Sequence, residues 1–178
     1  LSDTFVPKES SFSKNQILNR DYTNPYDVEV VIREITEENA MRLRKHSLIT
    51  STIKLTIGYS KHTIEPGFSH QMAIEATDSS KKLTDYMIRL FRKHYQPYPV
   101  RVINVTFTKI APKQDYQINL FESLEDVLKD EQLDDIIDIV RRKYGYTSLL
   151  HASSLIQNSM AIQRSKLLGG HQADTQSK

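Results

Sequence analysis

The chain has 178 residues, of which 38% are hydrophobic and 26% charged, values ordinary for one globular domain with an appendage. It contains no cysteine, which excludes disulfides and thiolate metal sites and fits a reducing cytoplasm. No apolar run approaches the roughly 18 residues that a membrane span needs. The N-terminus has neither an initiator Met nor a signal core, so we expect an excised fragment of a longer protein.

Charge is unevenly distributed. Residues 1–110 carry 16 Lys or Arg against 12 Asp or Glu, whereas residues 111–145 carry 5 against 9. A basic domain followed by an acidic segment suggests two surfaces with different partners, although ordinary variation between solvated faces explains the imbalance equally well.

The first half of the chain predicts a strand, a helix and two further strands. Residues 1–10 are polar and indicate a linker, and residues 11–18 predict a short strand. Asn24-Pro25 supplies a cap and a first-turn proline for a helix. Residues 52–59 alternate apolar and polar side chains, which is the clearest strand pattern in the chain, and residues 70–76 predict the returning strand. The helix carries an apolar stripe of Val28, Val31, Ile32, Ile35 and Leu43.

A second helix and a fourth strand follow. Asp78, Ser79 or Ser80 caps the helix, and Pro97 and Pro99 end it. Residues 100–110 predict the last strand. The second helix carries a stripe of Leu83, Met87, Leu90, Phe91 and His94.

The order β-α-β-β-α-β favours an α+β fold of the ferredoxin-like, split βαβ type, with a four-stranded sheet and both helices on one face. The open face would then be polar, carrying Lys54, Thr56, Gly58, Gln71, Asn104, Thr106 and Thr108.

The remaining residues predict a helical C-terminal extension. We divide the chain into a linker (1–10), a domain (11–111), a tether (112–123) and the extension (124–178). Residues 124–144 form an acidic helix that stops at Gly145, and its apolar residues recur at helical spacing: Leu133, Ile136, Ile137, Val140 and Tyr144. The end of the chain is a polar tail.

The sequence offers no catalytic constellation. The six histidines lack ligand spacing, and His94 is better explained as a histidine at the core edge than as a ligand. The cluster Asp134-Asp135-Asp138 is better explained as a solvated helix face than as a cation site. We therefore expect no active site, cofactor or metal within this chain.

Two features remain. The open sheet face has hydroxyl and amide groups with few lysines, which suits contacts to phosphates better than base stacking, although an inert solvated face explains it too. The second feature is a peptide on the tether, which either staples the following helix to the domain or anchors in a partner's pocket. It comprises Gln117, Ile118, Asn119, Leu120 and Phe121.

This peptide resembles the bacterial sliding-clamp-binding motif, Gln-x-(Ser/Asp/Asn)-Leu-Phe. Its position after a β-α-β-β-α-β domain resembles the little finger of Y-family translesion DNA polymerases of the UmuC/DinB (ImpB/MucB/SamB) type. Residues 15–22, 58–60 and 102–107 resemble the first strand and turn, the end of the second strand and the last strand of that domain. Residues 136–145, 164–166 and 169–173 resemble the tail of Gram-positive UmuC-like repair proteins.

The resemblance implies a cytoplasmic, SOS-type DNA-repair polymerase whose palm carboxylates and Mg²⁺ lie outside this chain. Its implied partners are duplex primer-template DNA, the sliding clamp, and a UmuD-like protein or RecA. It places phosphate contacts on the sheet face, and the clamp contact on residues 117–121. The candidate DNA-binding residues are Lys54, Thr56, Ser60, Lys61, Arg101, Asn104, Thr106, Thr108 and Lys109.

Two alternatives stay open. A free-standing ferredoxin-like regulatory domain would bind a metabolite or a protein, and a glycine-rich ligand turn, which we do not find, would favour it. An RNA-binding module would need aromatic residues on its central strands, and residues 70–76 contain none.

Overall fold

A computed structural model describes residues 11–113, 123–155 and 159–162. The linker 1–10 and the clamp-motif residues 117–121 therefore lie outside the described residues. The elements, in chain order, are β1 (Ser11–Tyr22), α1 (Pro25–Lys45), β2 (Leu48–Tyr59), β3 (Gly67–Thr77), α2 (Ser80–His94), β4 (Val100–Pro112) and α3 (Leu124–Tyr144), then the 3-10 turns η1 (Tyr146–Ser148) and η2 (Ala152–Leu155).

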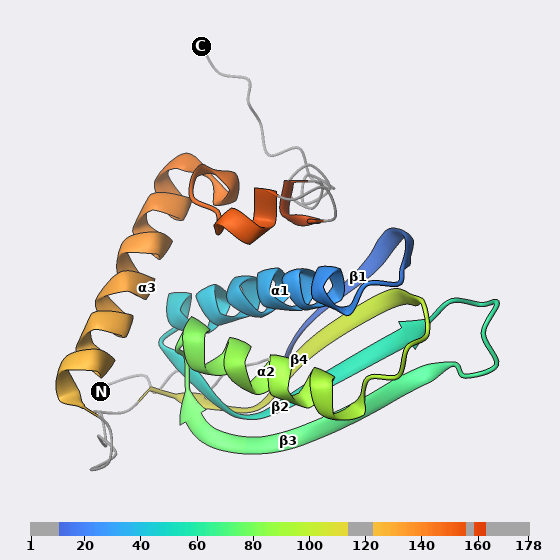
Figure 1. Ribbon diagram of the computed structural model, residues 1–178. Coiled ribbons are helices and arrows are strands. Elements are labelled where there is room, and N and C mark those ends of the chain that lie inside the picture. Colours follow the sequence, from blue (N-terminus) through green and yellow to red (C-terminus); the bar gives the residue numbers. More distant parts are fainter. Residues whose placement is uncertain (1–10, 114–122, 156–158, 163–178) are drawn as a thin grey trace.

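The predicted order β-α-β-β-α-β is confirmed. The four strands form one antiparallel sheet in the order β1-β4-β2-β3, so each βαβ unit is split by an intervening strand. Helices α1 and α2 lie side by side on one face of the sheet, and the other face is left open by the elements described (Figure 1). No helix among the described residues is long and apolar enough to span a membrane.

The hydrophobic core fills the space between the sheet and the two helices. Alternate side chains of β2 and β4 point into it because strand side chains alternate between faces. The predicted stripes of α1 and α2 meet them, and removing this apolar surface from water holds the layers together. The fully buried members include Ile53, Leu55, Ile103, Val105, Phe107, Val28, Ile35, Leu83 and Phe91.

Both helices begin at the predicted caps. The Asn24 side chain accepts a hydrogen bond from the Tyr26 N–H, and the Ser79 hydroxyl accepts one from the Lys82 N–H. These side chains satisfy N–H groups that have no partner within the helix. The predicted α3 is also confirmed, and Gly145 ends it with a φ of 90°.

The first strand is longer than predicted and has unusual polarity. It extends to Tyr22 past an irregularity between Ile17 and Tyr22. On its inner side Lys14 forms an ion pair with Glu38 of α1, whereas Ile17 on its outer side is 62% exposed. Lys14 points inward here because α1 supplies a charged partner, so polarity alone does not indicate which face of β1 is buried.

The faces of α3 correct the interpretation of its acidic cluster. Asp134 and Asp138 are buried, at 8% and 5% exposure, so they are not a solvated helix face. The apolar residues Leu133 and Ile136 are instead more than half exposed. The helix therefore packs on the domain through its charged side.

Candidate nucleic-acid interface

The open sheet face carries a grid of short polar side chains. Strand register aligns Ser13, Thr106, Lys54 and Gln71 in one row across β1, β4, β2 and β3. The neighbouring row consists of Asn15, Asn104, Thr56 and Ser69.

Hydrogen bonds hold this grid in place. The Ser13 hydroxyl donates to Asn104 Oδ1 at 2.9 Å, and the Thr106 hydroxyl donates to the same oxygen at 3.0 Å. Thr56 Oγ1 lies 2.8 Å from Ser69 Oγ. Because these side chains are short and tied together, ordering them on a ligand costs little entropy. The chemistry presented is hydroxyl and amide groups with a lysine, which suits phosphate oxygens.

One end of the face is apolar and tightly built. Ile17 of β1 lies opposite Val102 of β4, which in turn lies opposite Gly58 of β2. A Cβ at Gly58 would lie 3.1 Å from the Cβ of Val102, so a larger residue would push the strands apart. Gly67 opens β3 with a φ of 130°, a conformation that residues with a Cβ rarely adopt.

The structure brings five of the nine predicted DNA contacts together on this face. Lys54 is exposed near its centre, and Thr56, Asn104, Thr106 and Thr108 are partly exposed around it.

The other four candidates lie at or beyond the strand ends. Lys61 is exposed in the loop after β2, and Arg101 Nη1 lies 3.4 Å from Asp21 Oδ1. Lys109 is exposed near the opposite end of β4, with a left-handed φ of 50°. Ser60 is a correction, because it is only 5% exposed and its N–H is bonded to Pro99 O, which leaves little of it available to a polyanion.

The prediction from sequence missed Ser13, Asn15 and Ser69. Their positions follow from strand register, which the sequence does not give. The signal for Ser13 and Asn15 was the alternation Ser11, Ser13, Asn15 along β1, which Lys14 and Gln16 on the inner side obscured.

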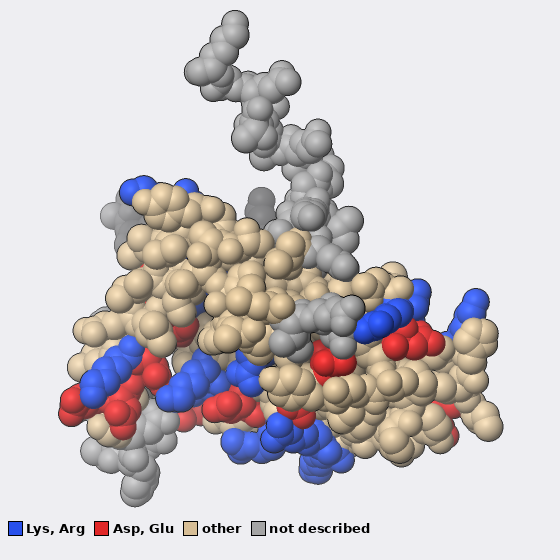
Figure 2. Space-filling view, turned by 45° about the horizontal axis from the view of Figure 1, so that its top comes forward, with Lys and Arg blue, Asp and Glu red and all other residues tan. Residues whose placement is uncertain are grey.

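The helix side offers a contrasting surface. There acidic and basic side chains lie close to one another, and the described residues form no large patch of one charge sign in that view (Figure 2). The guanidinium of Arg92, for example, is bonded to the Glu29 carboxylate at 2.7 Å through Nε. A mixed surface of this kind attracts a polyanion less than the two central rows of the sheet face, which contain Lys54 and no carboxylate.

His94 occupies the core edge, as predicted. Its ring stacks on that of His70 with centroids 3.7 Å apart, and Phe68 lies beside both. Burial lowers the pKa of His94, and the neighbouring His70 lowers it further. Among the described residues no group of three or more His, Asp or Glu side chains is arranged to hold a metal ion.

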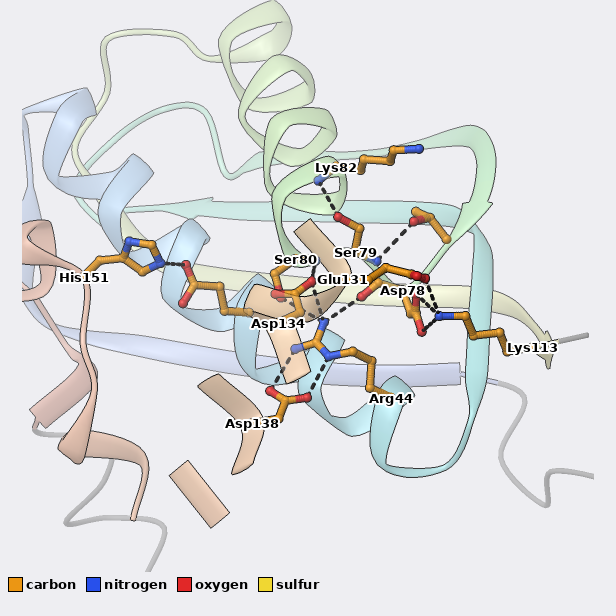
Figure 3. Close-up of polar contacts among 12 residues, drawn as sticks. Arg44, Asp78, Ser79, Ser80, Lys82, Lys113, Glu131, Asp134, Asp138 and His151 are labelled. Carbon is orange, nitrogen blue, oxygen red and sulfur yellow. Dashed lines mark hydrogen bonds and ion pairs between the residues drawn. The ribbon is translucent and has the colours of Figure 1, made fainter. Parts of the chain in front are cut away.

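Arg44 of α1 anchors α3 to the domain (Figure 3). It donates to both carboxylate oxygens of Asp138, through Nε at 2.7 Å and Nη2 at 2.9 Å. Its Nη1 donates to Asp78 O, Ser80 Oγ and Asp134 Oδ2. Burial alone would lower the pKa of Arg44, but the Asp138 hydrogen bond and the charges of Asp134, Asp138 and Asp78 raise it.

Asp134 lies between this arginine and α2. It accepts a hydrogen bond from the Ser80 N–H at 2.9 Å, in the first turn of α2. Burial nevertheless raises the pKa of Asp134, and Arg44 offsets this effect only in part. Nearby, Lys113 joins the end of β4 to α3 by pairing with Glu131 as well as with Asp78.

The residues after α3 pack on the far side of α1 (Figure 1). Glu34, buried at 2% exposure, accepts hydrogen bonds from the Ser159 hydroxyl and the Met160 N–H. Glu37 pairs with Arg141 and with His151. The acidic side of α1 is therefore covered by the extension, and the described residues of the extension leave the open sheet face uncovered.

Comparison with known protein families identifies the family to which this fold and its open polar face belong. The impB/mucB/samB family C-terminal domain matches residues 9–120. The chain belongs to this family.

Among its relatives is the "Putative UV-damage repair protein UvrX" of Bacillus subtilis, 38% identical over 164 residues, which cover 92% of this chain and 39% of the relative. The "DNA polymerase IV 2" of the same organism is 25% identical over 173 residues, 96% of this chain and 41% of the relative. The chain thus spans about two fifths of the length of these relatives. A structure titled "Complex of beta-clamp processivity factor and little finger domain of PolIV" aligns with a TM-score of 0.46 and 13% identity, covering 63% of this chain and 99% of that one.

Proposed function

We propose that this chain is the C-terminal part of an error-prone translesion DNA polymerase and that it grips primer-template DNA through its open sheet face. The observation that carries the proposal is that face: a hydrogen-bonded grid of hydroxyls and amides around Lys54, left uncovered by both helices and by the described part of the extension. Membership of the impB/mucB/samB family and the names of the repair and polymerase relatives support it.

In this proposal the face contacts the phosphate backbone, so binding is independent of base sequence. The short side chains allow the sheet to approach the duplex closely, and backbone contacts position a protein on DNA without reading bases. Lys61 and Arg101 at one end of β2 and β4, and Lys109 near the other, extend the contact along the strands.

Polymerization itself belongs to another part of the parent enzyme. The magnesium chemistry that the resemblance implies for the parent is assigned to palm carboxylates outside this chain. A UmuD-like protein or RecA stays a proposed partner that no described residue identifies.

Salt dependence of duplex binding tests the DNA proposal. Neutralising roughly 3–5 phosphates gives a slope of about −3 to −4.5 when the logarithm of the binding constant is plotted against the logarithm of the salt concentration. Removing three phosphate contacts should reduce the magnitude of this slope by about 2.7. We expect this reduction for Lys54→Ala/Lys61→Ala/Arg101→Ala, measured by fluorescence anisotropy.

The matched control removes three exposed cations from the helices. Lys45→Ala/Arg89→Ala/Lys93→Ala lowers the net charge equally, so it should leave the slope nearly unchanged. Equal slopes for the two triple variants would refute the placement of DNA on the sheet.

We also propose that residues 117–121 dock on the sliding clamp. Leu120 and Phe121 would fill an apolar pocket, and Gln117 would hydrogen-bond at its edge. Burial of such a side chain contributes about 1.5–3 kcal/mol, so Leu120→Ala/Phe121→Ala should cost about 3–5 kcal/mol of binding free energy. Calorimetric titration into a bacterial clamp measures it.

A melting curve of the same double variant separates docking from the alternative. An intramolecular staple predicts a lower melting temperature and an unchanged clamp affinity. Unchanged affinity would therefore refute clamp docking, whatever the melting curve shows.

A further inference from the structure

A pocket of about 270 Å³ lies between the N-terminal ends of α2 and α3. Ser79, Lys81 and Lys82 line the side formed by α2, and Ser123 and Val127 line the side formed by α3. Most of the wall surface is apolar, and Val127 is the single apolar side chain among the lining residues. The rest of that surface therefore consists of carbon atoms of the polar and charged side chains. Such a wall favours an apolar occupant, because burying apolar surface removes it from water.

The charged groups at the rim of this pocket need no further ligand. Lys81 Nζ lies 2.8 Å from Asp130 Oδ2, which joins α2 to α3. Glu131 pairs with the lysine that follows β4, at 3.0 Å. The remaining carboxylates, Asp85 and Asp126, are exposed to water, which solvates them. Apolar contact is therefore what the pocket still lacks.

The segment that leads into this pocket carries two large apolar side chains, Leu120 and Phe121. Residues 114–122 join the end of β4 to Ser123, and Ser123 itself lines the pocket. Consecutive Cα atoms are about 3.8 Å apart, so the Cα of Phe121 lies within about 7.6 Å of the Cα of Ser123. At such short range the covalent link gives both side chains a high effective concentration at the pocket.

Helix geometry and volume both fit this pair of side chains. An apolar residue just before an N-cap often packs against the fourth helical residue. Ser123 is the N-cap of α3 and Val127 is its fourth residue, and Phe121 stands one position earlier than the usual apolar residue. A cavity of about 150 Å³ holds a benzene ring. The larger volume of this pocket therefore accommodates an aromatic ring together with an aliphatic neighbour.

We propose that Leu120 and Phe121 occupy this pocket when the clamp is absent, so that the domain and the clamp compete for the same two side chains. The competition rests on the proposed clamp docking of residues 117–121, whereas occupation of the pocket does not. One side chain cannot lie in both places, so the clamp binds only the molecules whose peptide is free. The apparent clamp affinity falls by that fraction, about tenfold where the peptide is free one tenth of the time.

Tryptophan fluorescence of the full chain tests occupation of the pocket without the clamp. The chain contains no tryptophan, so Phe121→Trp reports on this position alone. We expect a blue-shifted emission and weak quenching by acrylamide, as for a ring that is removed from water.

A pair of variants on α3 tests whether this pocket is what shields the ring. Val127→Phe, added to Phe121→Trp, fills the pocket with its own side chain, so the emission should shift to the red and quenching should increase. Leu128→Phe is the matched control, because Leu128 is adjacent on the helix, 51% exposed and absent from the pocket wall. It should change neither the emission nor the quenching. Hydrogen exchange of residues 124–144 verifies that α3 stays docked in both variants.

Calorimetric titration into a bacterial clamp tests the competition in chains that keep Phe121. Val127→Phe should bind the clamp up to about tenfold more tightly than the parent, because its peptide is always free. Leu128→Phe should bind like the parent. With α3 docked in both variants, a purely structural role of Val127 predicts no gain in affinity.

A strongly quenched, red-shifted Phe121→Trp in the free chain would overturn the inference, because the pocket would then be left to another occupant, such as a second copy or a partner's side chain. Equal spectra for the Val127→Phe and Leu128→Phe chains would overturn it too. If the tryptophan is shielded but Val127→Phe binds the clamp no better than the parent, the competition is refuted. A shielded tryptophan without clamp binding by any chain would instead refute the proposed clamp docking and support occupation of the pocket.

Discussion

Replacing Arg44 by Met should release α3 while leaving the four-stranded domain folded. The guanidinium makes five hydrogen bonds that join α1 to the start of α2 and to α3. Methionine keeps much of the aliphatic volume and removes all five. Asp134 and Asp138 would then face the domain without their cation.

The burial of these two carboxylates determines how much free energy the loss of Arg44 costs. Removing one partner of a buried ion pair costs about 3–5 kcal/mol, because the remaining charge stays desolvated. Local detachment avoids this cost by returning both aspartates to water. We therefore expect a local opening rather than a proportional loss of global stability.

Hydrogen exchange followed by mass spectrometry measures this opening directly. Residues 124–144 should lose protection by several orders of magnitude, since each 1.4 kcal/mol corresponds to a factor of ten. Amides of β2 and β4 should keep theirs. Arg92→Met is the control, because the arginine of its ion pair with Glu29 is 67% exposed and water screens a surface pair of this kind, so its loss should leave protection unchanged.

A rescue variant tests whether the unpaired aspartates cause the loss of protection. Asp134→Asn/Asp138→Asn added to Arg44→Met removes the orphaned charges, so part of the protection should return. Unchanged protection of residues 124–144 in Arg44→Met would refute the assignment of Arg44 as the anchor, and loss of β2 and β4 protection would refute local opening.

Two further predictions concern a glycine and a histidine. Gly67→Ala should lower the free energy of unfolding by more than about 1 kcal/mol in urea titrations, because its Cβ would lie 1.9 Å from Ile57 O at a φ that alanine avoids; Gly145→Ala, which meets no atom within 4 Å, should cost less. His151 donates to Glu37, and this hydrogen bond raises its pKa above the ordinary value. The stabilisation is therefore fully present below about pH 6.5 and is lost as pH rises through the raised pKa; an NMR midpoint at or below that of a peptide histidine would contradict it.

The sequence predicted the domain well where the pattern of apolar and polar residues along an element indicates which side chains are buried. The alternation along residues 52–59 and the stripes of α1 and α2 place the same side chains in the core that the structure buries. At β1 it predicted the strand over residues 11–18 but not its continuation to Tyr22 or its inward face, where Lys14 pairs with Glu38 of α1. Such a pair joins residues distant in the chain, and periodicity contains no information about it.

The candidate interface was predicted in outline for the same reason. Residues on β2 and β4 share a face because their alternation is clear, so Lys54, Thr56, Asn104, Thr106 and Thr108 were grouped correctly. The row partners on β1 and β3 depend on register. Ser60 was misplaced because the chain turns after Tyr59 and bonds to Pro99 O, and strand alternation does not extend past a strand end.

The orientation of α3 shows how one residue elsewhere in the fold overrides amphipathicity. Turning the helix by half a turn would bury Ile136 and Ile139 further, gaining about 1–2 kcal/mol for each half-exposed side chain. The same turn would leave Arg44 buried without its two aspartate partners, at a cost of about 3–5 kcal/mol. It would also separate Arg141 from Glu37, which are both nearly buried. The charged contacts therefore decide the rotation, and Ile136 and Ile139 are left on the outward side of α3.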